Sequence, residues 1–277
     1  MRSIAKLMKD WQFTGPDGVT AAVALPHTWN AVDGQDGGND YWRGTCTYRT
    51  SFAAPAFDPA QQQVWLQFEG VNSSATVLLN GQQLCTHDGG YSTFRAEVTE
   101  LLQAENQLTV QVDNSVNDRV YPQKADFTFY GGIYRDVSLL VVNKNHIALG
   151  HFGDTGVKIT PALKEGSADI QMETLVEGEG TVVVELLDAE GNSVARSEGA
   201  KASLHLDAPH LWNGVKDPYL YTCVVRLMQD GKPVDEVTTK VGLRSFSVDA
   251  KKGFFLNGKP YPLHGVSRHQ DRKGLGN

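Results

Sequence analysis

The chain contains 277 residues, of which 40% are hydrophobic and 21% are charged. This length predicts two ordinary domains, and the 28 glycines and 11 prolines are typical of a folded chain with many turns, which excludes a disordered protein. The net charge of −7 comes without clusters of Lys and Arg, so we expect neither nucleic acid nor a membrane as a partner.

The chain shows no targeting signal and no disulfide pattern. Residues 1–13 lack the unbroken apolar run that a signal peptide needs. Three widely spaced cysteines, Cys46, Cys85 and Cys223, fit neither a disulfide framework nor the paired spacing of a zinc site. We therefore expect small buried thiols and a cytoplasmic protein.

The first half of the chain has the period-two pattern of half-buried strands. Residues 64–68 and 108–112 place an apolar side chain at every second position. Asn80-Gly81 favours a two-residue hairpin because both residues accept a positive φ, and residues 87–90 are expected to form a similar tight connection. No sustained helical stripe interrupts this pattern, and the region is expected to end with a strand over 137–142.

A second all-β domain is expected after the polar break at residues 143–145. Its predicted strands cover residues 181–187, 221–227 and 237–241, with a further turn at Asp230-Gly231. The length is close to that of an immunoglobulin-like sandwich. The Cys and Trp spacing of antibody domains is absent, which does not exclude the sandwich because many such domains lack the disulfide.

The pattern changes once more after Ser247. A short apolar strand leads into Asn257-Gly258, and the polar cluster PLHGVSRHQD follows over residues 262–271. The residues up to Asn277 are too few for a third domain, so we expect a truncated one.

No self-contained active site is recognisable. The sequence has no phosphate-binding loop, dinucleotide-binding turn, His-Glu-x-x-His motif or nucleophile elbow. Residues 113–136 combine carboxylates with aromatic rings, which suits sugar hydroxyls and sugar ring faces, but the same residues are equally consistent with an internal plug of ion pairs and rings. Residues 41–44, YWRG, are similar in kind, and simple packing of Trp against Arg is the favoured interpretation there.

Taken together, these segments resemble glycoside hydrolase family 2 over essentially the whole chain. The motifs that resemble its jelly-roll sugar-binding domain are LPHTWN at 25–30, YWRG at 41–44, LNG at 79–81, GGY at 89–91 and FYGGIYRD at 129–136. Those that resemble the end of its immunoglobulin-like domain and the entry to its barrel are DPYLY at 217–221, VGLRSF at 241–246 and FLNGKP at 255–260.

The resemblance implies an all-β chain: a jelly-roll β-sandwich over residues 1–144, an immunoglobulin-like β-sandwich over 145–248, and the first strand of a truncated (β/α)8 barrel over 249–277. It also implies hydrolysis of a terminal β-glycoside with retention, by an acid/base and a nucleophilic carboxylate in the barrel. The family's acid/base glutamate follows an asparagine, and this sequence contains no Asn-Glu pair. We therefore predict no catalytic residue in this chain and expect it to be inactive alone.

The resemblance also implies substrate-binding positions. Asp126 matches the jelly-roll aspartate that β-galactosidases send into the active site, where it helps to hold galactose and, in some members, a sodium ion. His269 matches a barrel-strand histidine that contacts the sugar, and Asp40 and Arg43 are weaker candidates. The expected ligand is a β-galactoside. No cofactor is expected in this chain, while sodium or magnesium is expected at Asp126 in a full enzyme, which is expected to be a homo-oligomer.

Other functions remain open from the sequence. The form GVSRHQD at 265–271 is closer to β-galactosidases than to the β-glucuronidases or β-mannosidases of the same family. An autonomous carbohydrate-binding module would need a complete sugar site on the jelly roll. A third possibility is a purely structural pair of sandwiches, which would need no sugar site.

Overall fold

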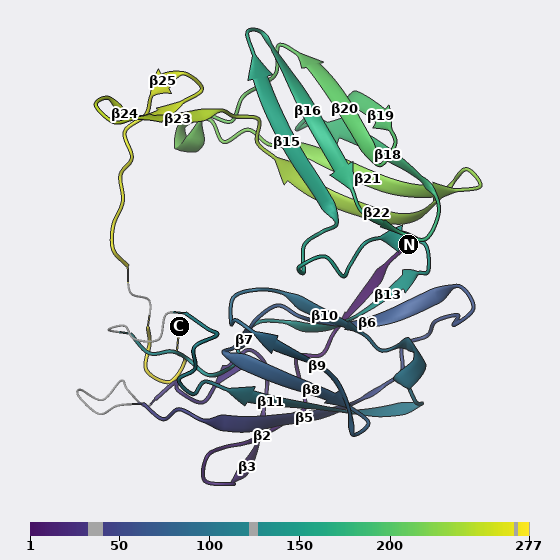
Figure 1. The fold of residues 1–277 in the computed structure, drawn as a ribbon, viewed down its shortest axis with the longest axis vertical. Helices are drawn as coiled ribbons and strands as arrows, with labels where there is room; N and C mark the ends of the chain where they lie inside the picture. The colour runs from purple at the N-terminus through teal and green to yellow at the C-terminus, as the bar shows by residue number, and fades with distance from the viewer. Residues whose placement is uncertain (33–40, 122–126, 269–270, 277) are drawn as a thin grey trace. The chain divides into compact units, whose positions relative to one another are not determined.

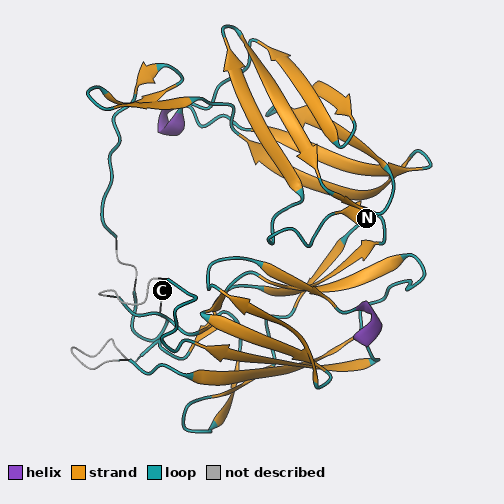
Figure 2. Cartoon of the chain, in the orientation of Figure 1, coloured by secondary structure: helices purple, strands orange, loops and turns teal. Residues whose placement is uncertain are grey.

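The computed structural model describes residues 1–32, 41–121, 127–268 and 271–276, and all further statements concern these residues. They form two compact units, each made of two chain segments. The N-terminal unit comprises Ser3–Val141 and Arg268–Asn277, and the central unit comprises Met1–Arg2 and Val142–Ser267. Strands dominate both units, and the helices are single 3₁₀ turns (Figure 2). None of the described helices is long and apolar enough to cross a membrane.

The N-terminal unit is a sandwich of antiparallel sheets (Figure 1). One sheet has the strand order β1-β13-β6-β10, a second has the order β3-β2-β5-β11-β8-β9, and a small third sheet has the order β4-β12-β7. The elements of this unit are β1 (Ser3–Lys6), β2 (Trp11–Thr14), β3 (Thr20–Val23), β4 (His27–Thr28), β5 (Thr45–Ala53), β6 (Gln62–Phe68), β7 (Val71–Asn72), β8 (Ser74–Leu79), β9 (Gln82–Asp88), β10 (Phe94–Glu97), η1 (Thr99–Leu101), β11 (Glu105–Asp113), β12 (Gly132–Ile133) and β13 (Val137–Asn143).

The core of this unit follows from the period-two pattern. On β6 and β11, every second side chain is fully buried, as predicted, and β5 buries Cys46, Tyr48, Thr50 and Phe52 in the same way. Trp11 and Tyr48 are completely buried and meet edge to face. The inner faces of the two large sheets therefore share one apolar core.

Two-residue hairpins form where Asn-Gly or Asp-Gly was expected to produce them. Asn80-Gly81 joins β8 to β9 with φ values of 53° and 83°, and both Asp230-Gly231 and Asn257-Gly258 also have positive φ at both residues. Residues 87–90 differ from the expectation. β9 lies at the edge of the six-stranded sheet and the next strand, β10, pairs with β6 in the other sheet, so this connection crosses between sheets and closes no hairpin.

The central unit is a second sandwich, formed by the sheets β15-β16-β20 and β19-β18-β21-β22. Its apolar core lies between them, which confirms the prediction of a second all-β region. The elements are β14 (His146–Ile147), β15 (Val157–Lys164), β16 (Ser167–Thr174), β17 (Val176–Glu177), β18 (Thr181–Leu187), β19 (Ser193–Glu198), β20 (Lys201–Asp207), η2 (Gly214–Lys216), β21 (Tyr221–Gln229), β22 (Lys232–Val241), β23 (Phe246–Asp249), β24 (Gly253–Leu256) and β25 (Lys259–Pro260).

A buried ion pair belongs to this sandwich. Arg2 donates from Nε and Nη2 to the two carboxylate oxygens of Asp235, at 2.8 and 2.6 Å, and Asp235 is fully buried. The same carboxylate accepts the backbone N–H of Ile147 at 2.8 Å. The carboxylate is thus paired and hydrogen-bonded, as a buried charge must be.

The end of the chain contains no closed barrel within the described residues. β23, β24 and β25 form a small antiparallel sheet, and after it the described residues hold only an isolated bridge between Arg272 and Gly276. The fold is therefore all-β with two sandwiches, as the sequence predicted.

The three cysteines are unpaired. Cys46 and Cys223 are buried and Cys85 is partly buried. Burial raises the pKa of the Cys46 thiol to about 12, with the Asp113 charge adding to the effect, and raises that of Cys223 to about 11. These are unreactive, neutral thiols, in agreement with the structural role expected for them.

Candidate functional site

The described residues contain one of the four predicted substrate-binding positions. Asp40, Asp126 and His269 lie outside the described residues, so their roles in sugar binding, and that of Asp126 in cation binding, stay predictions. Arg43 is described, and it immediately precedes β5 in the N-terminal unit. The site is therefore built from Arg43 and the motif residues around it.

The Arg43 guanidinium lies between two aromatic rings. Its central carbon is 4.9 Å from the centre of the Tyr41 ring and 4.7 Å from that of Phe129. Arg43 Nε also donates to the Tyr41 hydroxyl at 3.0 Å, and Nη2 contacts the same oxygen. Trp42, the residue before Arg43, meets Trp29 edge to face. Arg43 thus joins the segments 41–44 and 113–136.

Two buried asparagines hold these segments together. Asn30 is fully buried, and its Oδ1 accepts from Gly131 N at 2.8 Å and from Asn114 Nδ2 at 3.1 Å. Its Nδ2 donates to the Trp42 carbonyl at 3.0 Å. Asn114 in turn accepts from Gly44 N at 3.0 Å, so three distant motifs meet in one amide network.

The motif at 129–136 is fixed by close packing as well as by hydrogen bonds. Asn72 Nδ2 donates to the Tyr130 carbonyl at 2.7 Å. Gly131 lies against the indole of Trp29 so closely that a Cβ at this position would overlap the ring. Gly132 has a φ of 144° and would place a Cβ against the backbone of residues 27 and 28, so both positions require glycine.

The described residues between 113 and 136 include an ion-paired arginine and exposed aromatic rings. Arg119 forms an ion pair with Asp88 at 2.8 Å, and this hydrogen bond, with a second one from Ser74, lowers the pKa of Asp88. The ion pair connects Arg119 to β9, and the buried Asn114 connects the start of this segment to Asn30. Tyr121 and Phe127 nevertheless remain 77% and 40% exposed, so their rings are accessible to a ligand.

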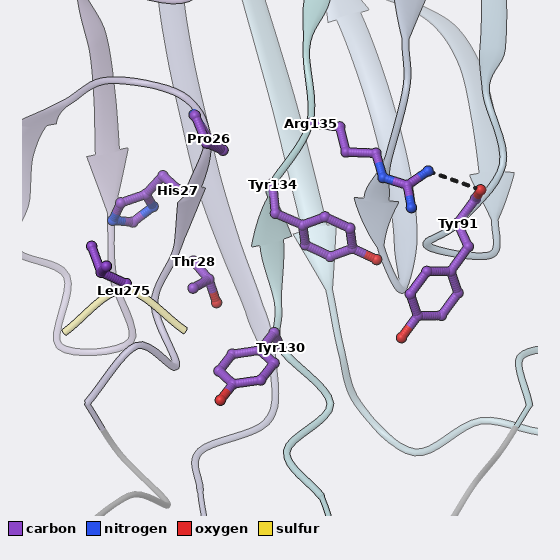
Figure 3. Close-up of a pocket in the computed structure, with 8 residues that line it drawn as sticks. All are labelled: Pro26, His27, Thr28, Tyr91, Tyr130, Tyr134, Arg135 and Leu275. Atoms are coloured by element: carbon purple, nitrogen blue, oxygen red, sulfur yellow. Dashed lines mark hydrogen bonds between the residues drawn. The ribbon is translucent and has the colours of Figure 1, made fainter. Parts of the chain in front are cut away.

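A cavity of about 240 Å³ opens beside this network, lined by residues that the sequence analysis did not single out (Figure 3). Tyr134 donates its hydroxyl to the Gly90 carbonyl at 2.7 Å, and Arg135 Nη1 donates to the Tyr91 carbonyl at 3.2 Å. The lining residues are Pro26, His27, Thr28, Tyr91, Tyr130, Tyr134, Arg135 and Leu275. All of them except Leu275 belong to motifs quoted above, and membership of these motifs is the sequence feature that could have identified them.

His27 lies at the inner wall of this cavity. Its Nδ1 is 2.7 Å from the Tyr48 hydroxyl, and its ring packs on Phe13 with centres 4.8 Å apart. Burial lowers the pKa of His27, so the imidazole is held neutral at physiological pH. The neutral imidazole can donate one hydrogen bond and accept another, but it carries no positive charge with which to bind an anion.

A smaller hollow of about 20 Å³ lies at Arg43, Tyr91, Tyr121 and Phe129. It holds about one water molecule and is too small for a sugar ring. The described residues also contain no group of three or more His, Cys, Asp or Glu side chains that could hold a metal ion. The described part of the N-terminal unit therefore offers a cavity and exposed aromatic rings.

Comparison with known families accounts for both units. Residues 37–171 match the glycosyl hydrolase 2 galactose-binding domain-like family, and residues 151–244 match the domain family described as glycosyl hydrolases family 2. The two matches follow each other along one chain. The chain belongs to glycoside hydrolase family 2.

Curated family 2 relatives align with almost the whole chain. A β-glucuronidase from Bacteroides fragilis is 37% identical over 98% of this chain and 42% of its own length. A β-galactosidase from Bacteroides ovatus is 33% identical over 96% of this chain and 34% of its own length. The chain thus spans well under half of the length of these relatives.

Solved family 2 structures have the same fold over the whole chain. An FMN-binding β-glucuronidase from Faecalibacterium prausnitzii superposes with a TM-score of 0.94 at 38% identity, covering 100% of this chain and 45% of that one. A β-galactosidase assigned as putative, from Bacteroides fragilis, gives a TM-score of 0.92 at 38% identity, covering 99% and 46%. The resemblance predicted from the motifs is confirmed.

Proposed function

We propose that this chain is the non-catalytic, substrate-site-flanking part of a retaining glycoside hydrolase that cleaves terminal β-glycosides. The observation that carries the proposal is the presence of two successive family 2 domains in one chain that resembles glycosidases over its whole length. The acid/base and nucleophilic carboxylates, about 5 Å apart in a retaining enzyme, are assigned to a (β/α)8 barrel in the longer protein. The lack of any Asn-Glu pair in this sequence supports that assignment.

The N-terminal unit would supply one side of the sugar site. Arg43, Tyr121 and Phe127 combine a cation with accessible rings, and sugar ring faces pack well on such aromatic surfaces. Asp126 is proposed as the carboxylate that accepts sugar hydroxyl groups and that binds sodium or magnesium in the whole enzyme. An acceptor-only carboxylate suits both tasks.

The first substrate candidate is a terminal β-galactoside, and the second is a β-glucuronide. The similarity to the Bacteroides ovatus β-galactosidase, at 33% identity, supports the β-galactoside. The similarity to the Bacteroides fragilis β-glucuronidase, at 37% identity, supports the β-glucuronide. The two sugars differ at carbon 6, where galactose has a hydroxyl and glucuronic acid a carboxylate. A glucuronide site therefore needs a cation near this carbon, and a galactoside site does not.

The test is hydrolysis of p-nitrophenyl β-galactoside and β-glucuronide by the whole protein, with this chain alone as the control. The whole protein is expected to hydrolyse one of them and the 277-residue chain neither. Asp126→Ala in the whole protein is expected to raise KM at least about tenfold, the cost of one lost hydrogen bond to a charged group. Hydrolysis by the chain alone would contradict the assignment of the chemistry to the barrel.

The unpaired cysteines are those of a protein in a reducing compartment, which supports a cytoplasmic location. As in the sequence analysis, the whole enzyme is proposed to be a homo-oligomer. Size-exclusion chromatography with light scattering on the whole protein tests this, and a monomer at all concentrations would contradict it.

A further inference from the structure

The last described residues form a self-contained turn. Arg272 N donates to Gly276 O at 2.8 Å, and Gly276 N donates to Arg272 O at 2.9 Å. Leu275 N also donates to Arg272 O at 3.0 Å. The turn thus has a defined backbone conformation, and it belongs to the N-terminal unit although it comes from the opposite end of the sequence.

The turn is seated on β4 and the residues around it. Gly274 N donates to the Ala31 carbonyl at 2.6 Å. Gly276 is buried with a φ of 85°, and a Cβ there would lie 2.8 Å from Thr28 Cγ2 and 3.2 Å from the Tyr130 ring. Only glycine allows this approach, because any Cβ would push the turn away from the threonine methyl.

The surface that receives the turn is itself fixed. Thr28 Oγ1 donates to the Gly131 carbonyl at 2.7 Å and accepts the Asn30 backbone N–H at 3.2 Å. Tyr130 is 7% exposed, and its carbonyl accepts from Asn72. Leu275 lies next to His27 and Thr28 at the cavity (Figure 3). The amide network therefore holds a rigid seat for the turn.

We propose that Gly276 is a positioning residue of the hydrolase: its contact with Thr28 and Tyr130 anchors the turn, and the turn holds Leu275 at the wall of the cavity in the proposed sugar site. This rests on the proposed function, in which the N-terminal unit supplies one side of the sugar site. Thr28 belongs to the first motif, LPHTWN, so this motif would hold the turn in place as well as contribute to the core.

The first experiment measures seating directly on the 277-residue chain. Trypsin cleaves after Arg272 and Lys273, and cleavage in a folded protein follows the fraction of time that a segment is detached. Gly276→Ala is expected to speed cleavage at these two bonds at least about tenfold, as overpacking by a buried methyl group implies. Mass spectrometry identifies the cleaved bonds.

Gly274→Ala is the matched control. Gly274 also has a positive φ, 89°, but a Cβ there meets nothing within 4 Å. This variant reports backbone strain without the clash, so its cleavage should be clearly slower than that of Gly276→Ala. Thr28→Ser removes Cγ2 and keeps Oγ1, so adding it to Gly276→Ala should restore most of the protection. Equal cleavage of the two glycine variants, or no rescue, would overturn the seating.

The second experiment measures kinetic constants of the whole protein with the same variants. Gly276→Ala is expected to raise KM about tenfold while kcat changes less than about twofold, because a misplaced sugar contact weakens ground state and transition state alike. Thr28→Ser should reverse the rise in KM. If trypsin shows that the turn is detached in Gly276→Ala but KM and kcat are unchanged, the positioning role is overturned and the seating of the turn still stands. A whole protein inactive toward all β-glycosides would overturn the proposed function with it.

Discussion

Replacing Asn30 by alanine should destabilise the N-terminal unit selectively. Among the described residues, the substitution removes three side-chain hydrogen bonds, those with Gly131 N, Asn114 Nδ2 and Trp42 O. Each contributes about 1 kcal/mol, and the Gly131 N–H, left buried without an acceptor, adds roughly 1 kcal/mol more. We therefore expect the free energy of unfolding to fall by about 4 kcal/mol, and Tm by roughly 8 to 16 °C.

Tryptophan fluorescence during urea unfolding can follow this unit. Of the five tryptophans, only Trp212 lies in the central unit, so the signal reports mainly on the N-terminal one. The control is Gln83→Ala, an exposed amide side chain on β9 of the same unit, which should change stability by less than about 0.5 kcal/mol. A loss below about 1 kcal/mol for Asn30→Ala, or an equal loss in the control, would refute the role given to the amide network.

Three further outcomes follow from contacts described above. Gly131→Ala should cost about 1 to 3 kcal/mol in a thermal unfolding scan because its methyl group would overlap the indole ring, whereas Gly150→Ala, with open space around it, should be nearly neutral. Arg2→Ala should destabilise the central unit by about 3 to 5 kcal/mol by leaving the Asp235 carboxylate buried and unpaired, and a loss below about 1 kcal/mol in urea titrations would contradict this. His27 has a lowered pKa in the folded state, so the unfolded chain takes up a proton first as pH falls below about 6.5, and the free energy of unfolding of the wild type should decrease there more steeply than that of His27→Gln.

The strands and hairpins were largely predictable because they are local properties. Alternation on β6 and β11 follows from burial of one face, and Asn80-Gly81 has the conformation that its residues favour. The crossing from β9 to β10 was not predictable from residues 87–90. Turn residues show where a chain changes direction, but the choice of sheet depends on partners far along the sequence. β15 was overlooked because Pro161 stands on its half-buried apolar face, and a proline within a run argues against a strand.

The site was only partly predictable. Arg43 was selected from its motif, but its contact with Phe129 depends on how two distant loops meet. The pairing of Asn30 with Asn114 has no local signal either, because buried amides find their partners through the tertiary fold. Motif resemblance indicated which segments matter, and the structure shows that amide hydrogen bonds and close-packed glycines hold them together.

The composition of each unit from an early and a late segment has a consequence during translation. Arg2 is synthesised before its partner Asp235, and the segment Ser3–Val141, which is most of the N-terminal unit, is made between them. In the same way, the seat on Thr28 waits for Gly276. The central unit is therefore complete only after residue 267 has been synthesised, and the N-terminal unit only after the turn at residues 272–276. A chain cut after Val141 would contain Arg2 without Asp235, and the seat on Thr28 without the turn. Domain-swapped or truncated variants of this protein should keep both ends of each unit.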